Sequence, residues 1–319
     1  MKKIIIVSGD PNSINSEIIF KSWKKISQNT RKKIFIVGSY NLLHRQFKKM
    51  NYPIRLKNVK NLNEVSKKKE LKIIDVNLNF DDPFNVEQKT VSTYIKKCFN
   101  LAHRLSLSKK TAGLINCAID KKLLPKKNIG VTELLADKCK IKKDTEVMMI
   151  KSKNLSVCPV TTHLNLKDVS KNISSNKIIA KVHTMQNWYK RFYKKKPKIG
   201  IMGLNPHNAE LRDKSEEVNQ IIPAIKKLNK LGFNIKGPLV ADTLFVKDYK
   251  NFNIIVGMYH DQILTPFKSI YKFNAINVTL GLKYLRVSPD HGVGKDIIKK
   301  NVADYSSLLD CIKFINKFG

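Results

Sequence analysis

The chain has 319 residues, 42% of them hydrophobic, which is enough for a buried core in each of about two domains. This composition excludes a disordered chain. The formal net charge is +36, from 61 Lys and Arg against 25 Asp and Glu, so nucleic acid and anionic membranes must be considered as partners. The basic residues are mostly lysines in short runs over the whole length, without regularly interleaved aromatic residues. This pattern favours a solvated basic surface, with a nucleic-acid-binding protein as the alternative.

The cysteines and the first residues bear on the cellular compartment. Five cysteines without C-x-x-C spacing are typical of reduced, buried thiols. The apolar run Ile4–Val7 is too short for a signal peptide or a membrane span. We therefore expect a cytoplasmic protein with no membrane partner.

Taken in chain order, short apolar runs alternate with longer helical patterns. The runs cover residues 4–7, 34–38, 73–76, 112–116, 147–150, 155–160, 199–204 and 253–258. Apolar residues recur at helical spacing from Val91 to Leu105, from about 215 to 231 before Gly232, and from Ala303 to Phe318. Alternation of this kind predicts an α/β fold with a mostly parallel sheet.

Three histidines each follow an apolar run that we interpret as a buried strand: His163, His207 and His260. In α/β enzymes, ligands bind at the carboxyl ends of the strands. A catalytic metal takes three protein ligands and keeps a position open for substrate. Each histidine alone is better explained as a hydrogen-bonded structural residue than as a ligand, and their separations do not match a compact zinc finger. The spacing alone therefore favours the structural interpretation and leaves the metal site as the alternative.

The region from Tyr259 to Gly292 is rich in polar side chains, whereas standard nucleotide motifs are absent from the sequence. It contains Lys268 and Arg286. The compact ammonium group of a lysine and the bidentate guanidinium group of an arginine can together bind a phosphate or a carboxylate. In so basic a chain, any single lysine is also explained as an exposed surface residue that binds no ligand. Neither G-x-G-x-x-G nor G-x-x-x-x-G-K-[ST] occurs, so no standard Rossmann or P-loop site is predicted.

An ordered set of short strings carries a family resemblance over nearly the whole chain. The strings are Gly9-Asp10-Pro11, Gly130-Val131-Thr132-Glu133, Thr161-Thr162-His163, Gly203-Leu204-Asn205-Pro206-His207, Gly237-Pro238-Leu239-Val240-Ala241-Asp242-Thr243, Tyr259-His260-Asp261-Gln262, Asn277-Val278-Thr279-Leu280-Gly281 and Asp290-His291-Gly292. Together and in this order they resemble the 4-hydroxythreonine-4-phosphate dehydrogenase family, the NAD-dependent enzymes of pyridoxal phosphate synthesis.

The resemblance implies two α/β domains around a cleft, similar to the isocitrate and isopropylmalate dehydrogenases. Residues 1–319 would form a single family unit of two α/β subdomains that are discontinuous in sequence. The resemblance also implies a homodimer with the site near the interface, a nicotinamide cofactor (NAD or NADP), and a divalent metal such as Zn, Mg or Co. It assigns no catalytic acid or base in this chain.

The resemblance further implies roles for individual residues. His163, His207 and His260 fall on the metal ligands. The substrate-binding positions are Thr132, Lys268, Asn277 and Arg286, and the cofactor-side positions are Asp290 and His291. The implied reaction is oxidation with decarboxylation of 4-phosphohydroxy-L-threonine to 3-amino-2-oxopropyl phosphate.

Three departures from the family's pattern concern the substrate. Val131 stands where the family has a substrate-contacting histidine. The first loop, Gly9–Glu17, lacks two glycines and a proline, and the glycine-rich loop after His207 is replaced by residues 208–213. Added Cβ atoms restrict close backbone approach to a ligand. Two further hypotheses are therefore a dehydrogenase of another phosphorylated hydroxy acid, such as threonate 4-phosphate, and an inactive metal-binding relative.

Overall fold

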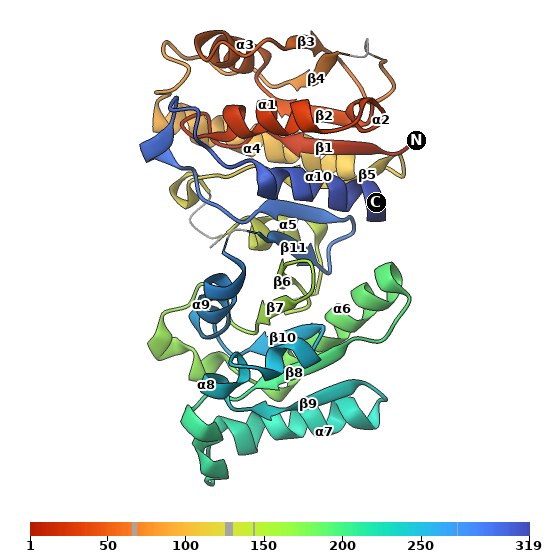
Figure 1. Cartoon of the computed structure of the whole chain (residues 1–319), viewed down its shortest axis with the longest axis vertical. Coiled ribbons are helices and arrows are strands. Elements are labelled where there is room, and N and C mark those ends of the chain that lie inside the picture. Colours follow the sequence, from red (N-terminus) through yellow and green to blue (C-terminus); the bar gives the residue numbers. More distant parts are fainter. Residues whose placement is uncertain (66–68, 125–129, 143, 273) are drawn as a thin grey trace. The chain divides into compact units, whose positions relative to one another are not determined.

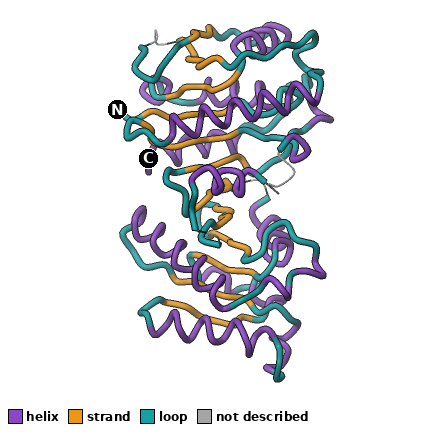
Figure 2. The backbone as a smooth tube through the Cα atoms, turned by 180° about the vertical axis from the view of Figure 1, so that it is seen from behind, coloured by secondary structure: helices purple, strands orange, loops and turns teal. Residues whose placement is uncertain are grey.

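The computed structural model describes residues 1–319 except 66–68, 125–129, 143 and 273. It contains two compact units (Figure 1). Unit 1 comprises Met1–Lys138 and Lys283–Gly319, and unit 2 comprises Cys139–Leu282. Each unit is a sheet with helices packed against it (Figure 2). The α/β fold class predicted from the sequence is therefore confirmed.

The sheet of unit 1 is built from parallel strands in the order β3-β4-β2-β1-β5-β12. The strands are β1 Lys3–Val7, β2 Ile34–Gly38, β3 Arg55–Asn58, β4 Glu70–Asp75, β5 Thr111–Asn116 and β12 Arg286–Pro289. β1 and β2 are almost entirely buried, because helices cover both faces of a parallel sheet. Their continuous apolar sequence follows from this burial.

The helices of unit 1 are α1 Asn15–Lys25, α2 Gln28–Arg31, α3 Tyr40–Lys49, α4 Gln88–Ser106, α5 Val131–Cys139 and α10 Ser306–Phe318. Of these, α3, α4 and α10 pack against strands of the sheet. α1 and α10 contact each other, and α4 lies behind the sheet against β1 and β5 (Figure 1). The apolar stripe predicted from Val91 onward is the buried face of α4, so it belongs to the core.

The sheet of unit 2 has the order β11-β6-β7-β10-β8-β9. Its strands are β6 Val147–Lys151, β7 Ser156–Pro159, β8 Lys198–Met202, β9 Asn234–Leu239, β10 Ile254–Gly257 and β11 Ile276–Leu280. β7, β10, β8 and β9 are parallel, whereas β6 is antiparallel to β7 and β11. The short connection from β6 to β7 accounts for this exception, because parallel neighbours need a long crossover.

The helices of unit 2 are α6 Ser175–Tyr193, α7 Ile222–Lys230, α8 Ala241–Leu244 and α9 His260–Tyr271. α6 contacts α7, and α9 packs on β7 and β10. The helix predicted over about 215–231 begins with one π-helical turn, Glu217–Ile221, and Gly232 follows its end with φ +77°. None of the helices in the described part of the chain is both long and apolar enough to cross a membrane.

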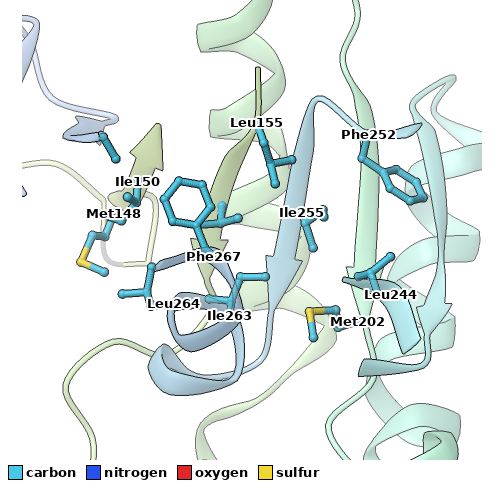
Figure 3. Close-up of a cluster of buried hydrophobic side chains, with 12 residues drawn as sticks. Met148, Ile150, Leu155, Met202, Leu244, Phe252, Ile255, Ile263, Leu264 and Phe267 are labelled. Carbon is cyan, nitrogen blue, oxygen red and sulfur yellow. The ribbon is translucent and has the colours of Figure 1, made fainter. Parts of the chain in front are cut away.

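α9 is anchored by a cluster of buried apolar side chains (Figure 3). Ile263, Leu264 and Phe267 pack among residues of β6, β7, β8 and β10, including Ile255 and Met202. Burying each of these side chains stabilises the fold by about 1.5–3 kcal/mol. The helix comes so close to β10 that a Cβ at Gly257 would lie 2.7 Å from the Cβ of Ile263. This contact fixes the start of α9, where His260 is located.

Phe267→Ala is expected to lower the free energy of unfolding by about 3–5 kcal/mol, because it leaves a cavity beneath α9. Ile270→Ala is the matched control, since Ile270 lies on the same helix and is 39% exposed, and surface changes cost within about 0.5 kcal/mol. Urea denaturation followed by circular dichroism measures both variants. Equal losses would contradict the packing described for α9.

Candidate functional site

The three histidines singled out in the sequence follow three neighbouring strands of unit 2. β10 pairs in parallel with β7 on one side and with β8 on the other. His163 lies in the loop after β7, His260 opens α9 after β10, and His207 follows β8. The carboxyl ends of parallel strands meet at one edge of a sheet. The strands predicted before these residues are confirmed, and their order places the three loops at that edge.

Two of these imidazoles lie close together. The ring centroids of His163 and His260 are 5.4 Å apart, with an angle of 37° between the ring planes. The Nδ1 of His260 is 2.6 Å from Oδ1 of Asp261. A carboxylate on one ring nitrogen fixes the orientation of the ring and directs the other nitrogen, here Nε2, toward a ligand.

His207 begins a left-handed turn that contains no glycine. Five consecutive residues, His207 to Leu211, have φ between +49° and +57°. The left-handed conformation costs about 1–2 kcal/mol for each such residue, so the surroundings must hold the turn in place. Asn208 donates from Nδ2 to the carbonyl of Pro238 at 3.1 Å, and Ala209 is buried. His207 itself is exposed.

Within the described residues, no three His, Cys, Asp or Glu side chains are grouped as a metal-ligand set. The structure therefore brings His163 and His260 together, and it places His207 on the neighbouring strand end without forming a closed triad.

Gln262 connects the loops that carry His260 and His207. Its Oε1 accepts from the backbone N–H of Met258 at 2.7 Å, and its Nε2 donates to the carbonyl of Gly203 at 2.8 Å. The first contact resembles a capping box, in which Gln in the first helical turn reaches back to a free amide. The second fixes the end of β8 relative to α9. Sequence reasoning placed Gln262 in a family string but gave it no role.

The candidate substrate residues of unit 2 are Lys268 and Asn277. Lys268 is half-buried on α9, two turns or about 12 Å beyond His260 along the helix axis. Asn277 is half-buried in β11 and lies opposite Ile150 of β6. A helix and a strand, rather than loops, therefore position these two residues.

The other candidates lie in unit 1, where Arg286 is the most constrained. It is 2% exposed, and its Nε donates to Oδ1 of Asn116 at 2.8 Å. Burial lowers the pKa of its guanidinium to about 10, partly offset by Cys311, Tyr284 and Glu133. Arg286 therefore keeps its charge at neutral pH, and Asn116 sets its direction.

The remaining candidates of unit 1 are Thr132, which lies in a helix, and Asp290 and His291, which make hydrogen bonds that involve the backbone. Thr132 is buried in the first turn of α5. The backbone N–H of Asp290 donates to Oγ of Ser307 at 3.0 Å, and Nδ1 of His291 is 2.8 Å from the carbonyl of Gly292. These three residues and Arg286 belong to unit 1, whereas the histidine trio, Lys268 and Asn277 belong to unit 2.

In the loop after β1, polar residues replace several residues of the family's pattern, and Asn15 stands where a glycine was expected. Asn12 exchanges two hydrogen bonds of 2.8 Å with the backbone of Val86, and Asn15 donates to the carbonyl of Ala118 at 2.8 Å. Gly9 keeps the left-handed φ of +78° that its turn requires. Hydrogen bonds from its own side chains therefore hold the altered loop against Val86 and Ala118.

Comparison with solved structures gives the class of fold first. The chain shares its fold with a β-decarboxylating dehydrogenase of Thermococcus kodakarensis, with a TM-score of 0.51 and 9% identity over 99% of this chain and 82% of that chain. At that identity the likeness concerns the fold alone. The expected similarity to this class of α/β dehydrogenase is confirmed.

The family follows from the sequence. Residues 30–315 match the family model "Pyridoxal phosphate biosynthetic protein PdxA", and the chain belongs to this family. It is 37% identical to a 4-hydroxythreonine-4-phosphate dehydrogenase of Sulfurihydrogenibium sp., over 98% of this chain and 97% of the relative. A Klebsiella pneumoniae structure of the same name has a TM-score of 0.83 at 26% identity, covering 98% and 97%. The family resemblance inferred from the sequence is confirmed.

One relative has another name. A protein of Oceanobacillus iheyensis, provisionally named D-threonate 4-phosphate dehydrogenase, is 29% identical over 96% of this chain and 95% of its own length.

Gln262→Ala is expected to expose the amide of Met258 and to loosen the end of β8, because both hydrogen bonds of the side chain are lost. Each buried group left without a partner costs about 1–3 kcal/mol. Hydrogen exchange should become faster at the Met258 amide. Gln262→Glu is the matched variant, since it keeps the acceptor for Met258 and removes only the donor to Gly203. Unchanged exchange in Gln262→Ala would show that the contact does not hold the loop.

Proposed function

We propose that the chain is a 4-hydroxythreonine-4-phosphate dehydrogenase. It would catalyse the metal-assisted oxidation, with decarboxylation, of 4-phosphohydroxy-L-threonine to 3-amino-2-oxopropyl phosphate, with NAD or NADP as hydride acceptor. One observation carries the proposal. In a chain of this family, His163, His260 and His207 follow the adjacent parallel strands β7, β10 and β8.

The spacing of two of the three proposed donors supports a divalent metal. Two imidazoles that share a tetrahedral ion, with metal–nitrogen bonds of about 2.0–2.1 Å, have ring centroids about 5 Å apart. The separation of 5.4 Å between His163 and His260 agrees with this value. His207 on the adjacent loop is the third proposed ligand. We propose zinc first, with Co as an alternative, because imidazole nitrogen suits zinc whereas Mg prefers oxygen ligands. A bound ion would supply Lewis-acid polarisation of the substrate hydroxyl.

The other residues of the proposed site bind and orient the substrate. Lys268 and Arg286 would hold its anionic ends, and Thr132 and Asn277 would supply hydrogen bonds. Arg286 is buried and hydrogen-bonded to Asn116. Its guanidinium group would therefore be oriented before the substrate binds, which reduces the entropic cost of binding. Asp290 and His291 would contact the cofactor.

We further propose a cytoplasmic homodimer with its site near the subunit interface. Light scattering coupled to gel filtration tests the dimer directly. A monomer with full activity would contradict this part of the proposal and leave the reaction itself untouched.

An alternative substrate is favoured by two observations. Val131 opens α5, directly before Thr132, at the position where a substrate-contacting imidazole was expected. The relative from Oceanobacillus iheyensis is named for a D-threonate 4-phosphate activity. The alternative function is therefore the oxidation of threonate 4-phosphate or another phosphorylated hydroxy acid by the same residues.

His163→Ala is expected to lower the bound metal to background and to abolish NADH formation, because one of three ligands is lost. The metal content of the purified protein and the absorbance of NADH measure the two effects. His44→Ala is the control, since His44 lies exposed on α3 in unit 1. Full activity of His163→Ala after chelator treatment would rule out the metal role.

NADH formation with 4-phosphohydroxy-L-threonine, threonate 4-phosphate and erythronate 4-phosphate distinguishes the proposed substrates. Lys268→Ala is expected to lower kcat/KM for the preferred substrate about 10–100-fold, as removal of a charged hydrogen bond costs about 1.5–3 kcal/mol. Lys227→Ala, at an exposed lysine of α7, should have no effect. Turnover of threonate 4-phosphate alone would favour the alternative. No turnover of any compound, even after Val131→His, would indicate an inactive metal-binding relative.

A further inference from the structure

Glu217 is a fully buried acidic side chain that the proposed reaction does not use. It is 0% exposed and is the first residue of the π-helical turn that precedes α7. π-helical turns are rare and frequently occur at functional sites. A buried carboxyl group is costly unless hydrogen bonds compensate for the loss of water, so its partners indicate what it does.

The partners of Glu217 belong to the loop that leads from β8 to His207. Its Oε1 accepts from the backbone N–H of Leu204 at 2.7 Å and from that of Asn205 at 2.8 Å. Its Oε2 accepts from Nδ2 of Asn205 at 2.9 Å. Three donors from two consecutive residues therefore converge on one buried carboxyl group.

The backbone at Gly203 lies close against this carboxyl group. A Cβ at Gly203 would lie 3.0 Å from Oε1 of Glu217 and would collide with Oδ1 of Asn208. The carbonyl of Gly203 is also bound by Gln262. Glu217 thus holds the loop from one side, and Gln262 holds it from the side of α9.

The position of the Asn205 backbone determines the position of His207. Only Pro206 separates Asn205 from His207, and the ring of proline fixes its φ near −65°. His207 then enters the left-handed turn, which persists only where its surroundings hold it. A shift of the Asn205 backbone would therefore move the imidazole of His207.

We propose that Glu217 is a positioning residue that holds the loop Gly203–His207 and thereby sets the place of the His207 imidazole. This inference rests on the proposed role of His207 as a metal ligand. Glu217 acts through the backbone of Leu204 and Asn205 and does not itself contact the ion or substrate.

The variants Glu217→Ala and Glu217→Gln test the proposal with two measurements. In the metal-free protein, hydrogen exchange at the amides of Leu204 and Asn205 should be fastest in Glu217→Ala. It should be intermediate in Glu217→Gln, which keeps an oxygen for the amides but turns an NH2 toward Asn205. The affinity for Zn²⁺, measured by competition with a chelating dye, should fall about 10-fold in Glu217→Ala, as it does when groups that orient a ligand are removed.

Glu216→Ala is the matched control. Glu216 is adjacent in sequence and accepts from Nδ2 of Asn205 at 2.8 Å, and its other contact is with Ser170. Its loss should leave exchange at Leu204 unchanged. If Glu217→Ala does not fold, Glu217→Gln supplies both measurements.

The outcomes separate this inference from the proposed function. If His207→Ala loses zinc while both Glu217 variants bind it like the wild type, the positioning role is overturned and the metal site stands. If the wild type binds no zinc, the proposed zinc site fails, and the positioning role is decided by exchange alone. Unchanged exchange at Leu204 and Asn205 in the Glu217 variants overturns it in either case.

Discussion

The parallel pairing of β7, β10 and β8 is the constraint on which the candidate site depends. Two strands that pair in parallel end at the same edge, so the loops that follow them are brought together although they are far apart in sequence. Packing of Phe267 and Ile263 beneath α9 fixes the loop of His260, and Glu217 fixes the loop of His207. The loops of His260 and His207 are therefore held by side chains that take no part in the proposed chemistry.

The charged and polar candidate residues of the two units differ in how far they are buried. In unit 2 the histidines, Lys268 and Asn277 are half-buried or exposed on helices, strands and loops. In unit 1 the guanidinium of Arg286 is enclosed by the core and directed by Asn116. A buried cation interacts more strongly with an anionic partner than an exposed one does, because less solvent screens it. The buried guanidinium of Arg286 alone is better suited to a small anionic group than to the extended surface of a nucleic acid.

The sequence predicted most of the strands because their residues are buried on both faces and form continuous apolar runs, as in β1 and β10. It did not predict β3 at the edge of the sheet, where Arg55 and Asn58 are exposed and Leu56 and Lys57 are only half-buried. It also did not predict β9, which contains Gly237 and Pro238, or the short strands β11 and β12. The histidines were recognisable from their place after apolar runs. Glu217 and Gln262 were not, because their burial and partners depend on contacts between distant strands. Nor does any glycine signal the left-handed turn at His207.

The left-handed turn from His207 to Leu211 also bears on how this loop can change in evolution. Each of its five residues carries a Cβ in a conformation that favours glycine. Replacing one of residues 208–211 by glycine would relieve backbone strain and would remove the side-chain contacts of that residue. The conformation of this loop is therefore compatible with a glycine-rich sequence as well as with the present one.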